Sequence, residues 1–442
     1  MEATPLAVPF VQVLAEEGLT RVPERYVRPQ YDRPILSTTV PLRQVPIIDL
    51  SKLLSKNFKG PELERLHHAC KEWGFFQLIN HGVSTSLLEN VKRGVREFFN
   101  LPMEEKMKFQ QRQGETEGYG QLLVFSEDQK LEWGDMLYML TLPPEMRKPH
   151  SLPKYHLPCR NYLEAYYAEM KKVNMQILEL MANALSIDTK EMTALFAAGT
   201  QKTKFNYYPP CPQPELVIGI KPHSDLGGLT ILLQANEVEG LQIKKDGQWI
   251  PIKPLPNAFI INIGDMLEVI TNGIYRSIEH RATVNSVMER ISIATFNNPI
   301  TESTLGPLPS LITPTTPAVF RTINFAEYLR GYFSREVFGK SYLARKLGTC
   351  CGKAASSQIY TSIIYVFIST LYFYLTLLLV PVSALFCDFV YQGLMLLMLV
   401  SALGHPMIGA ANVKFGFCYT TAISPLVFKL KGISILLVGT LL

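Results

Sequence analysis

Two histidines and one aspartate place the strongest constraint on how this chain folds. His223 and Asp225 stand two residues apart in Lys221-Pro-His-Ser-Asp225, and His280 follows much later in Ser277-Ile-Glu-His280. Two imidazoles and one carboxylate are the ligand set that holds non-haem Fe(II) on one face and leaves other positions open. A His-x-Asp tripeptide alone is weak evidence for a metal site, because such tripeptides occur by chance in many chains. A lone histidine such as His280 is usually a core or surface residue. If all three bind one ion, the fold must bring the segment around His280 alongside the segment around His223.

The residues around this triad predict short strands. If Val217 to Thr230 is extended, alternation places His223 and Asp225 on the same face. Gly227-Gly228 then allows a sharp turn or a close backbone approach, so the metal is expected at the end of a strand. Tyr275 to Ala282 follows a Thr-Asn-Gly turn and is expected to be the second strand.

A third segment offers a cation and a hydroxyl to a bound acid. Arg290 and Ser292 are two residues apart at the start of the strand-like run Ile291 to Phe296. Their guanidinium and hydroxyl groups can therefore meet one carboxylate. On its own, Arg290 beside Glu289 is better explained as a surface cation at the end of a charged loop. Together with the triad, it is favoured as the anchor of a dicarboxylate that also reaches the metal.

The spacing of apolar residues divides the chain into regions. They are an N-terminal extension 1–45, a mostly helical region 46–195, a core of short strands 196–300, a closing region 301–349 and a hydrophobic tail 350–442. Helices are expected over Val11 to Gly18, Pro61 to Lys71, Leu87 to Phe99, Tyr162 to Ala184 and Arg330 to Arg345. Lys245-Asp-Gly-Gln248 predicts a hairpin.

Further motifs surround the triad. They are Asn206-Tyr-Tyr-Pro-Pro-Cys-Pro212, Pro222-His-Ser-Asp225, Gly240-Leu-Gln-Ile243, Pro256-Asn-Ala-Phe259, Asn262-Ile-Gly-Asp265, Ser277-Ile-Glu-His280 and Arg290-Ile-Ser292. Jointly they resemble the plant soluble branch of the 2-oxoglutarate and Fe(II)-dependent dioxygenases. Leu101-Pro-Met-Glu-Glu-Lys106, Val124-Phe-Ser-Glu-Asp-Gln-Lys130 and Arg147-Lys-Pro-His150 carry a finer likeness to the senescence-related, codeine O-demethylase-like and S-norcoclaurine synthase-like group. The resemblance covers roughly residues 10 to 345.

This resemblance implies a fold and a set of site residues. The fold would be α+β, with a double-stranded β-helix (jelly roll) core and flanking N-terminal helices. The family's metal ligands correspond to His223, Asp225 and His280. Its anchors for the distal carboxylate of 2-oxoglutarate correspond to Arg290 and Ser292, with a hydroxyl from Tyr208 and Asn206 as a polar neighbour.

The resemblance also implies an activity. With Fe(II), O2, 2-oxoglutarate as co-substrate and ascorbate as reductant, such an enzyme hydroxylates or O-demethylates a plant specialised metabolite, giving succinate and CO2. An alkaloid, a flavonoid or another phenolic is the expected substrate. Two alternatives stay open: an ascorbate-dependent non-haem iron oxidase that does not use 2-oxoglutarate, and a non-catalytic small-molecule binder on the same fold.

Candidate residues of the substrate pocket are Tyr119, Phe125 and Phe296. The stretch from Gly118 to Phe125 is rich in glycine and large apolar side chains, and Phe296 follows Ala294 by one alternation on the strand of Arg290. For each of the three, a place in the hydrophobic core is the alternative.

Charge and cysteine content limit the partners and the compartment. The net charge of +5 is small for 442 residues, and we find no nucleic-acid motif, so a small molecule is the expected partner of a monomer. Cys70, Cys159 and Cys211 lack motif spacing, which fits a reducing compartment. The first residues lack a basic start and an apolar core, so no secretory signal is expected and the predicted location is cytoplasmic.

The apolar tail, which is expected to be helical, departs from the family pattern, because similar chains usually stop shortly after the segment that corresponds to Gly339-Lys-Ser-Tyr-Leu343. No charged residue occurs from Ala354 to Cys387, and segments 359–386 and 389–411 are long enough to cross a bilayer as apolar helices. Basic residues before the first segment would keep the catalytic part on the cytoplasmic side. Three interpretations compete: a membrane anchor, translated non-coding sequence at the end of the gene model, and a buried helical appendage.

Overall fold

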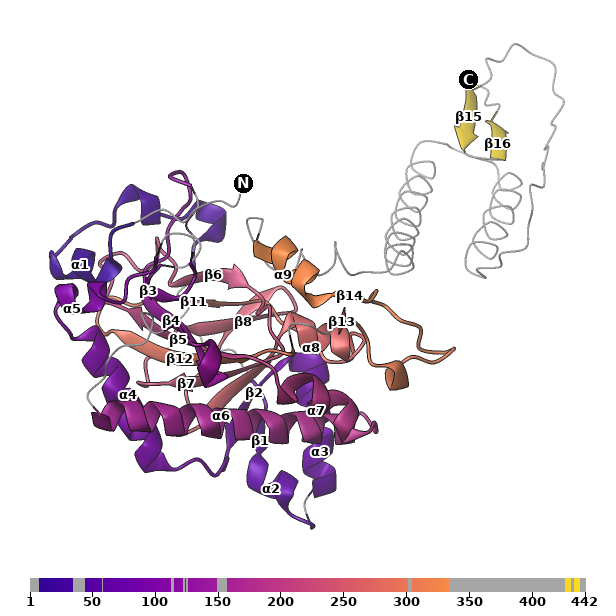
Figure 1. The fold of residues 1–442 in the computed structure, drawn as a ribbon. Coiled ribbons are helices and arrows are strands. Elements are labelled where there is room, and N and C mark those ends of the chain that lie inside the picture. Colours follow the sequence, from indigo (N-terminus) through magenta and orange to yellow (C-terminus); the bar gives the residue numbers. More distant parts are fainter. Residues whose placement is uncertain are drawn as a thin grey trace. The chain divides into compact units, whose positions relative to one another are not determined.

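Two β-sheets face each other in the unit formed by residues 1–356 (Figure 1). The large sheet runs in the order β1 (Ile47–Asp49), β2 (Phe75–Ile79), β10 (Phe259–Ile263), β7 (Leu229–Gln234), β12 (Arg290–Asn297), β5 (Gln201–Tyr208), β4 (Asp135–Leu142) and β3 (Gly118–Gly120). The small sheet runs in the order β6 (Ile220–His223), β11 (His280–Ala282), β8 (Leu241–Lys245) and β9 (Gln248–Pro251). This arrangement in the computed structural model confirms the predicted α+β jelly-roll class. The structure describes residues 8–34, 44–57, 59–112, 115–121, 124, 126–148, 157–300, 304–333, 426–430 and 433–437.

Alternate residues of the large sheet face opposite sides, as the pleat of a strand requires. One set packs toward the small sheet, in a cluster that includes Phe75, Leu232, Ile243, Ile250, Ile260 and Ala294. The other set packs beneath the helices and includes Phe76, Ile231, Ile261, Ile291 and Ile293. Because even-numbered residues of β12 and β5 face the space between the sheets, their polar members are available to a site there.

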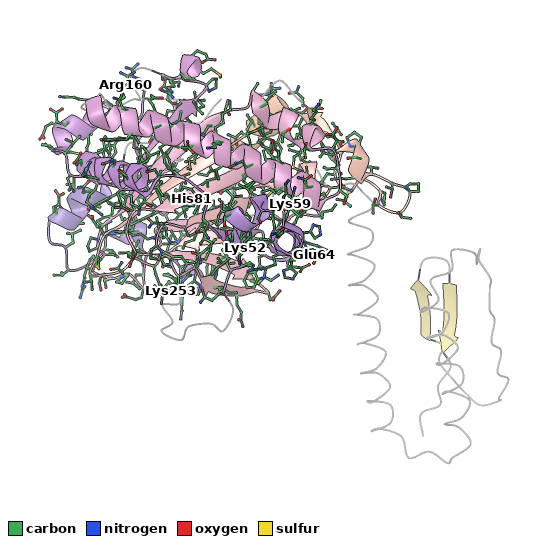
Figure 2. All side chains as sticks on the ribbon, turned by 90° about the horizontal axis from the view of Figure 1, so that it is seen from below. Lys52, Lys59, Glu64, His81, Arg160 and Lys253 are labelled. Carbon is green, nitrogen blue, oxygen red and sulfur yellow. The ribbon has the colours of Figure 1, made fainter. Side chains whose placement is uncertain are left out.

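Helices α3 (Lys59–His68), α4 (Thr85–Phe99), α6 (Leu157–Ala184) and α7 (Thr189–Ala197) cover the outer face of the large sheet (Figures 1 and 2). The other helices are α1 (Val11–Glu16), α2 (Leu50–Leu54), α5 (Met103–Met107), α8 (Asp265–Ile270) and α9 (Phe325–Phe333). The long helix α6 and the amphipathic α4 lie across the sheet and bury Val91, Val95 and Tyr166 in its core. The predicted helices therefore form, and α9 begins earlier than expected.

One helix end is fixed by a close backbone approach. After α3 the chain widens into a π-helical turn, Ala69–Trp73, and ends at Gly74 with φ of 61°. A Cβ at Gly74 would lie 2.1 Å from the carbonyl oxygen of Arg276. Only glycine fits this position just before β2, because the left-handed conformation and the close approach to Arg276 both disfavour a side chain.

One sequence expectation needs correction. Val217 to Thr230 is not one extended segment, because β6 ends at His223 and β7 begins at Leu229. The region 46–195, expected to be mostly helical, also supplies β1, β2, β3 and β4 to the large sheet. The predicted hairpin is confirmed: Lys245 pairs with Gln248, and Asp246 and Gly247 have φ of 51° and 78°, as a tight two-residue turn demands.

The second unit, residues 357–442, is described only in two strands. β15 (Leu426–Leu430) and β16 (Ile433–Leu437) form an antiparallel pair. In this part of the tail the expectation of a helix is wrong, because both described segments are strands. Segments 359–386 and 389–411 lie outside the described residues, as does the part of the predicted closing helix beyond Phe333. Among the described residues, no helix is both long and apolar enough to span a bilayer.

Candidate metal and co-substrate site

Strand pairing brings the three predicted ligands together. β6 and β11 are antiparallel neighbours, and His223 is the direct cross-strand partner of His280. Their ring centroids lie 4.2 Å apart. Asp225 follows β6 in the adjoining turn, and its Oδ1 lies 3.6 Å from Nε2 of His223 and 3.6 Å from Nε2 of His280. One ligand atom from each residue lies within 4.8 Å of the others, so one ion could meet all three.

The turn that carries Asp225 is held against the start of α8. The amide N–H of Asp265 donates to the carbonyl oxygen of Asp225 at 2.7 Å, and that of Gly264 donates to Gly228 at 2.8 Å. A Cβ at Gly228 would lie 2.2 Å from Cε1 of Phe196. The predicted close backbone approach at this glycine is therefore confirmed, and it fixes the position of the aspartate beyond the end of β6.

Hydrogen bonds orient every ligand group of the triad. Nδ1 of His223 lies 2.9 Å from the carbonyl oxygen of Lys221, and Nδ1 of His280 lies 3.1 Å from that of Ile278. Each carbonyl fixes the proton on Nδ1 and leaves the lone pair of Nε2 for a metal.

The carboxylate of Asp225 is held in a similar way. Its Oδ2 accepts hydrogen bonds from Oγ1 of Thr230 at 2.6 Å and from Nδ2 of Asn262 at 2.7 Å. Both partners are buried and come from neighbouring strands of the large sheet. Oδ1 is thereby directed at the histidines.

The electrostatics of the triad match these roles. Burial raises the pKa of Asp225, but the two imidazoles and the Thr230 hydroxyl outweigh burial and hold this pKa well below its usual range. Burial, assisted by His223, lowers the pKa of His280 to about 4. Burial also lowers the pKa of His223, yet the neighbouring Asp225 raises it overall. The carboxylate is therefore charged and His280 neutral near pH 7, and both states suit metal binding.

Arg290 forms the second part of the site. Its side chain is 2% exposed, its Nη2 donates to Oε1 of Gln234 at 3.0 Å and its Nη1 lies 3.5 Å from Oγ of Ser292. The guanidinium lies over the ring of Tyr208, with 5.3 Å between Cζ and the ring centroid. Asn206 donates to the same Ser292 hydroxyl at 3.3 Å.

No carboxylate of the described residues forms an ion pair with Arg290, and its buried Nε has no hydrogen-bond partner among them. Burial lowers the pKa of Arg290, with Tyr208 acting in the opposite direction. A cavity of about 70 Å³ joins this guanidinium to the triad. An anionic ligand that bridges Arg290 and a metal would fit this cavity and would give the Nε of Arg290 a hydrogen-bond acceptor.

A larger cavity of about 350 Å³ opens beside the triad. It shares His223, Asp225 and Phe296 with the small cavity. Apolar and aromatic side chains from β4, β12 and α9 form much of its wall, among them Met136, Tyr138, Leu140, Phe296, Phe325 and Leu329. This volume suits a small organic molecule.

The profile of the 2OG-Fe(II) oxygenase superfamily matches residues 199–299. A second profile, described as non-haem dioxygenase in morphine synthesis N-terminal, matches residues 45–157. Oxoglutarate-dependent flavonoid 7-O-demethylase 1 from Ocimum basilicum is 55% identical over 338 residues, which cover 76% of this chain and 90% of that protein. The chain belongs to the 2-oxoglutarate and Fe(II)-dependent oxygenases.

Two further relatives support this family assignment. Codeine O-demethylase from Papaver somniferum is 51% identical over 343 residues, covering 76% of this chain and 95% of that protein. The crystal structure of JOX2 in complex with 2OG, Fe and JA is 34% identical, with a TM-score of 0.72, and covers 78% of this chain and 99% of that one. Fe(II) is thus the metal of the oxygenase and 2-oxoglutarate its co-substrate, which favours the main sequence interpretation over an iron oxidase without 2-oxoglutarate or a non-catalytic binder.

The substrate-pocket candidates of the oxygenase had different outcomes. Phe296 lines both cavities, as expected. The expectation for Tyr119 is wrong: its ring is fully buried, stacks on Phe10 with centroids 4.9 Å apart and is not among the cavity-lining residues. The ring also meets that of Phe98 edge to face, with centroids 5.8 Å apart, so Tyr119 belongs to the hydrophobic core. Phe125 lies outside the described residues.

Sequence reasoning missed several residues of the oxygenase site. Thr230 and Asn262 hold Asp225 but belong to strands whose pairing no local pattern reveals. Lys204 and Lys202 also line the large cavity. They stand two and four residues before Asn206 on β5, so the alternation of a strand could have placed them on the same face.

Proposed function

We propose that the chain hydroxylates or O-demethylates a small aromatic plant metabolite, with the triad holding Fe(II) and Arg290 holding 2-oxoglutarate. The observation that carries the proposal is the cavity of about 70 Å³ that is lined by both His223 and Arg290. It opens beside a larger cavity that shares the metal ligands. Metal, co-substrate and substrate would then meet at one place.

Each proposed role follows from the side chain's contacts. Nε2 of His223, Nε2 of His280 and Oδ1 of Asp225 are the atoms that would bind the metal. The guanidinium of Arg290 and the hydroxyl of Ser292, 3.5 Å apart, would hold the distal carboxylate of 2-oxoglutarate. Tyr208 would contribute its hydroxyl beside the guanidinium, while Asn206 would orient Ser292 by its hydrogen bond.

The protein supplies position and a dry environment, and the cofactor supplies the oxidation. Bound together, Fe(II) and 2-oxoglutarate allow O2 to oxidise a C–H bond of the substrate, with 2-oxoglutarate converted to succinate and CO2. The wall of the large cavity, which includes Met136, Tyr138 and Phe296, would exclude water. It would also hold an aromatic ring near the proposed metal ligands. Orientation of the ring selects the oxidised carbon, and an oxidised O-methyl carbon leaves as formaldehyde.

The names of the relatives support the substrate class. Oxoglutarate-dependent flavonoid 7-O-demethylase 1, codeine O-demethylase and thebaine 6-O-demethylase share 50 to 55% identity with this chain. All three are named for the removal of a group from a substrate oxygen. A methoxylated flavonoid, alkaloid or other phenolic is therefore the proposed substrate.

Turnover by the full-length chain tests the proposal. The purified protein with Fe(II), ascorbate and 2-oxoglutarate is screened against methoxylated flavonoids, alkaloids and simple phenolics, and succinate and formaldehyde are measured. Succinate that rises with one compound supports the oxygenase reaction on that compound, and formaldehyde in equal amount assigns demethylation. Absence of both products with every compound, while iron is bound, would overturn the proposed substrate class.

A further inference from the structure

Two lysines on the floor of the large cavity have no anionic partner. Lys202 and Lys204 are half-buried, and both line the cavity of about 350 Å³. No carboxylate oxygen forms an ion pair with either ammonium group within the described part of the chain, where every ion pair lies elsewhere. Lys202 instead lies over the ring of Tyr138, with its Nζ 5.8 Å from the ring centroid.

The register of the large sheet places these lysines beside the aromatic wall. On β5, Lys204 is the cross-strand partner of Tyr138 of β4, and Lys202 is the partner of Phe296 of β12. The rings of Tyr138 and Phe296 meet edge to face, with centroids 6.3 Å apart. An aromatic molecule in the cavity would therefore have cations directly beside its ring.

The acidic groups near this floor hydrogen-bond to backbone amides, and among the described residues none forms an ion pair with Lys202 or Lys204. Oε1 of Glu132 accepts the amide N–H of Lys221 at 3.0 Å, and Oε2 of Glu117 accepts that of Leu140 at 3.0 Å. Asp135 accepts the amide N–H groups of Val11 and Gln12 at 3.0 and 2.8 Å. Asp225 is the proposed metal ligand, and a bound Fe(II) would compensate its charge. The two ammonium groups are thus available for direct contact with an anionic group of a substrate.

Burial is unfavourable for both cations. It lowers the pKa of Lys202, with Glu117 acting in the opposite direction, and it lowers the pKa of Lys204 against Glu132 and Asp225. A buried ammonium group without a partner is costly, and an incoming anion relieves that cost.

We propose that Lys202 and Lys204 select a substrate that carries an anionic oxygen, a carboxylate or an acidic phenolate, next to the methoxylated ring. This inference rests on the proposed function and narrows it, because a protonated alkaloid amine would meet repulsion at the same place. Lys204 also lines the small cavity, so contact with 2-oxoglutarate is the competing role that the test must separate.

Binding without turnover tests the inference. The full-length chain, loaded with Fe(II) and 2-oxoglutarate in the absence of O2, is titrated calorimetrically with three probes of one carbon frame. They are 4-methoxycinnamic acid, 4-methoxycinnamamide and 4-methoxycinnamylamine, which are anionic, neutral and cationic at pH 7.5. We expect the acid to bind about tenfold tighter than the amide, as for a hydrogen bond to a charged group, and the amine to bind least.

Substitution of the lysines should remove that preference. Lys202→Gln and Lys204→Gln should each weaken binding of the acid about tenfold and change binding of the amide less than twofold, while Lys202→Arg keeps the preference. Lys253→Gln, which removes an equal charge at an exposed position labelled in Figure 2, should behave like the unchanged chain.

Three results would overturn the inference. They are an acid that binds no tighter than the amide, a preference that survives both substitutions, and a Lys204→Gln variant that loses affinity for 2-oxoglutarate but keeps the preference for the acid. A failure of the proposed function would be seen separately, as absence of succinate and formaldehyde in the turnover screen.

Discussion

Replacing Thr230 by valine isolates the hydrogen bond that orients the aspartate of the triad. The change keeps the shape of a side chain that is only 4% exposed and removes a donor 2.6 Å from Oδ2 of Asp225. A hydrogen bond to a charged group contributes about 1.5–3 kcal/mol, and about 1.4 kcal/mol corresponds to tenfold in a binding constant. Asn262 still donates to the same oxygen at 2.7 Å, so we expect the smaller effect, about a tenfold weaker metal affinity.

The assay is an anaerobic titration with Co(II), followed by its visible absorption, and repeated with Fe(II) by equilibrium dialysis. Thr230→Val combined with Asn262→Leu leaves Oδ2 without either donor, and affinity should then fall about 100-fold. Thr203→Val is the matched control, because Thr203 is equally buried and its hydroxyl lies near Thr141 instead. Unchanged metal affinity in the double variant would refute the orienting role, and equal losses in Thr230→Val and Thr203→Val would assign the effect to packing of the sheet.

Three further predictions concern the same unit. His223→Ala should abolish succinate formation and metal binding while the circular dichroism spectrum stays unchanged, and full activity would remove His223 from the ligand set. Arg290→Lys, which keeps the charge but loses the forked donor, should raise the KM for 2-oxoglutarate about tenfold or more with a smaller change in kcat; an unchanged KM would move the carboxylate anchor elsewhere. Asp135→Asn should alter the dependence of stability on pH. Burial raises the pKa of Asp135 to about 6 from 3.8, against the amide N–H groups of Gln12 and Val11. The folded chain therefore binds more protons than the unfolded chain between these values, and stability should fall as pH rises through this range, by at most about 3 kcal/mol at 1.36 kcal/mol per pKa unit. Urea unfolding at pH 4 and pH 6.5 should show that loss in the unchanged chain and a smaller one in Asp135→Asn, and identical losses would contradict the assignment.

The candidate metal ligands could be proposed from the sequence because their chemistry is local to short motifs. The spacing of His223 and Asp225 and the pattern around Arg290 need no knowledge of the fold. Their meeting depends on a register, His223 opposite His280, that the sequence suggests only through a strand-like segment. Strand alternation does not bring His223 and Asp225 together, since the aspartate lies in a turn held by the amide of Asp265.

The substrate wall was harder to predict because it is assembled from distant strands. Tyr119 lies in a glycine-rich, apolar stretch that is typical of a pocket, yet Phe10 from the N-terminal segment occupies the space beside its ring. Tyr138 and Lys202 belong to strands that become neighbours only in the folded sheet. The specific site roles, the monomeric state and the cytoplasmic location stay predictions, and the segments proposed to cross a membrane lie outside the described residues.

The proposed catalytic residues and one side of the substrate cavity come from different parts of the chain. The metal ligands and Arg290 all come from the part of the chain after residue 220, whereas Met136, Tyr138 and Leu140 of the cavity wall come from β4, before residue 143. β4 is joined edge to edge with β5, so a chimaera that exchanges the residues up to the end of β4 between two relatives would keep the proposed iron and co-substrate residues and receive a different β4 side of the wall. Duplicated genes could thus acquire new substrates through changes in β4 while the later strands stay constant.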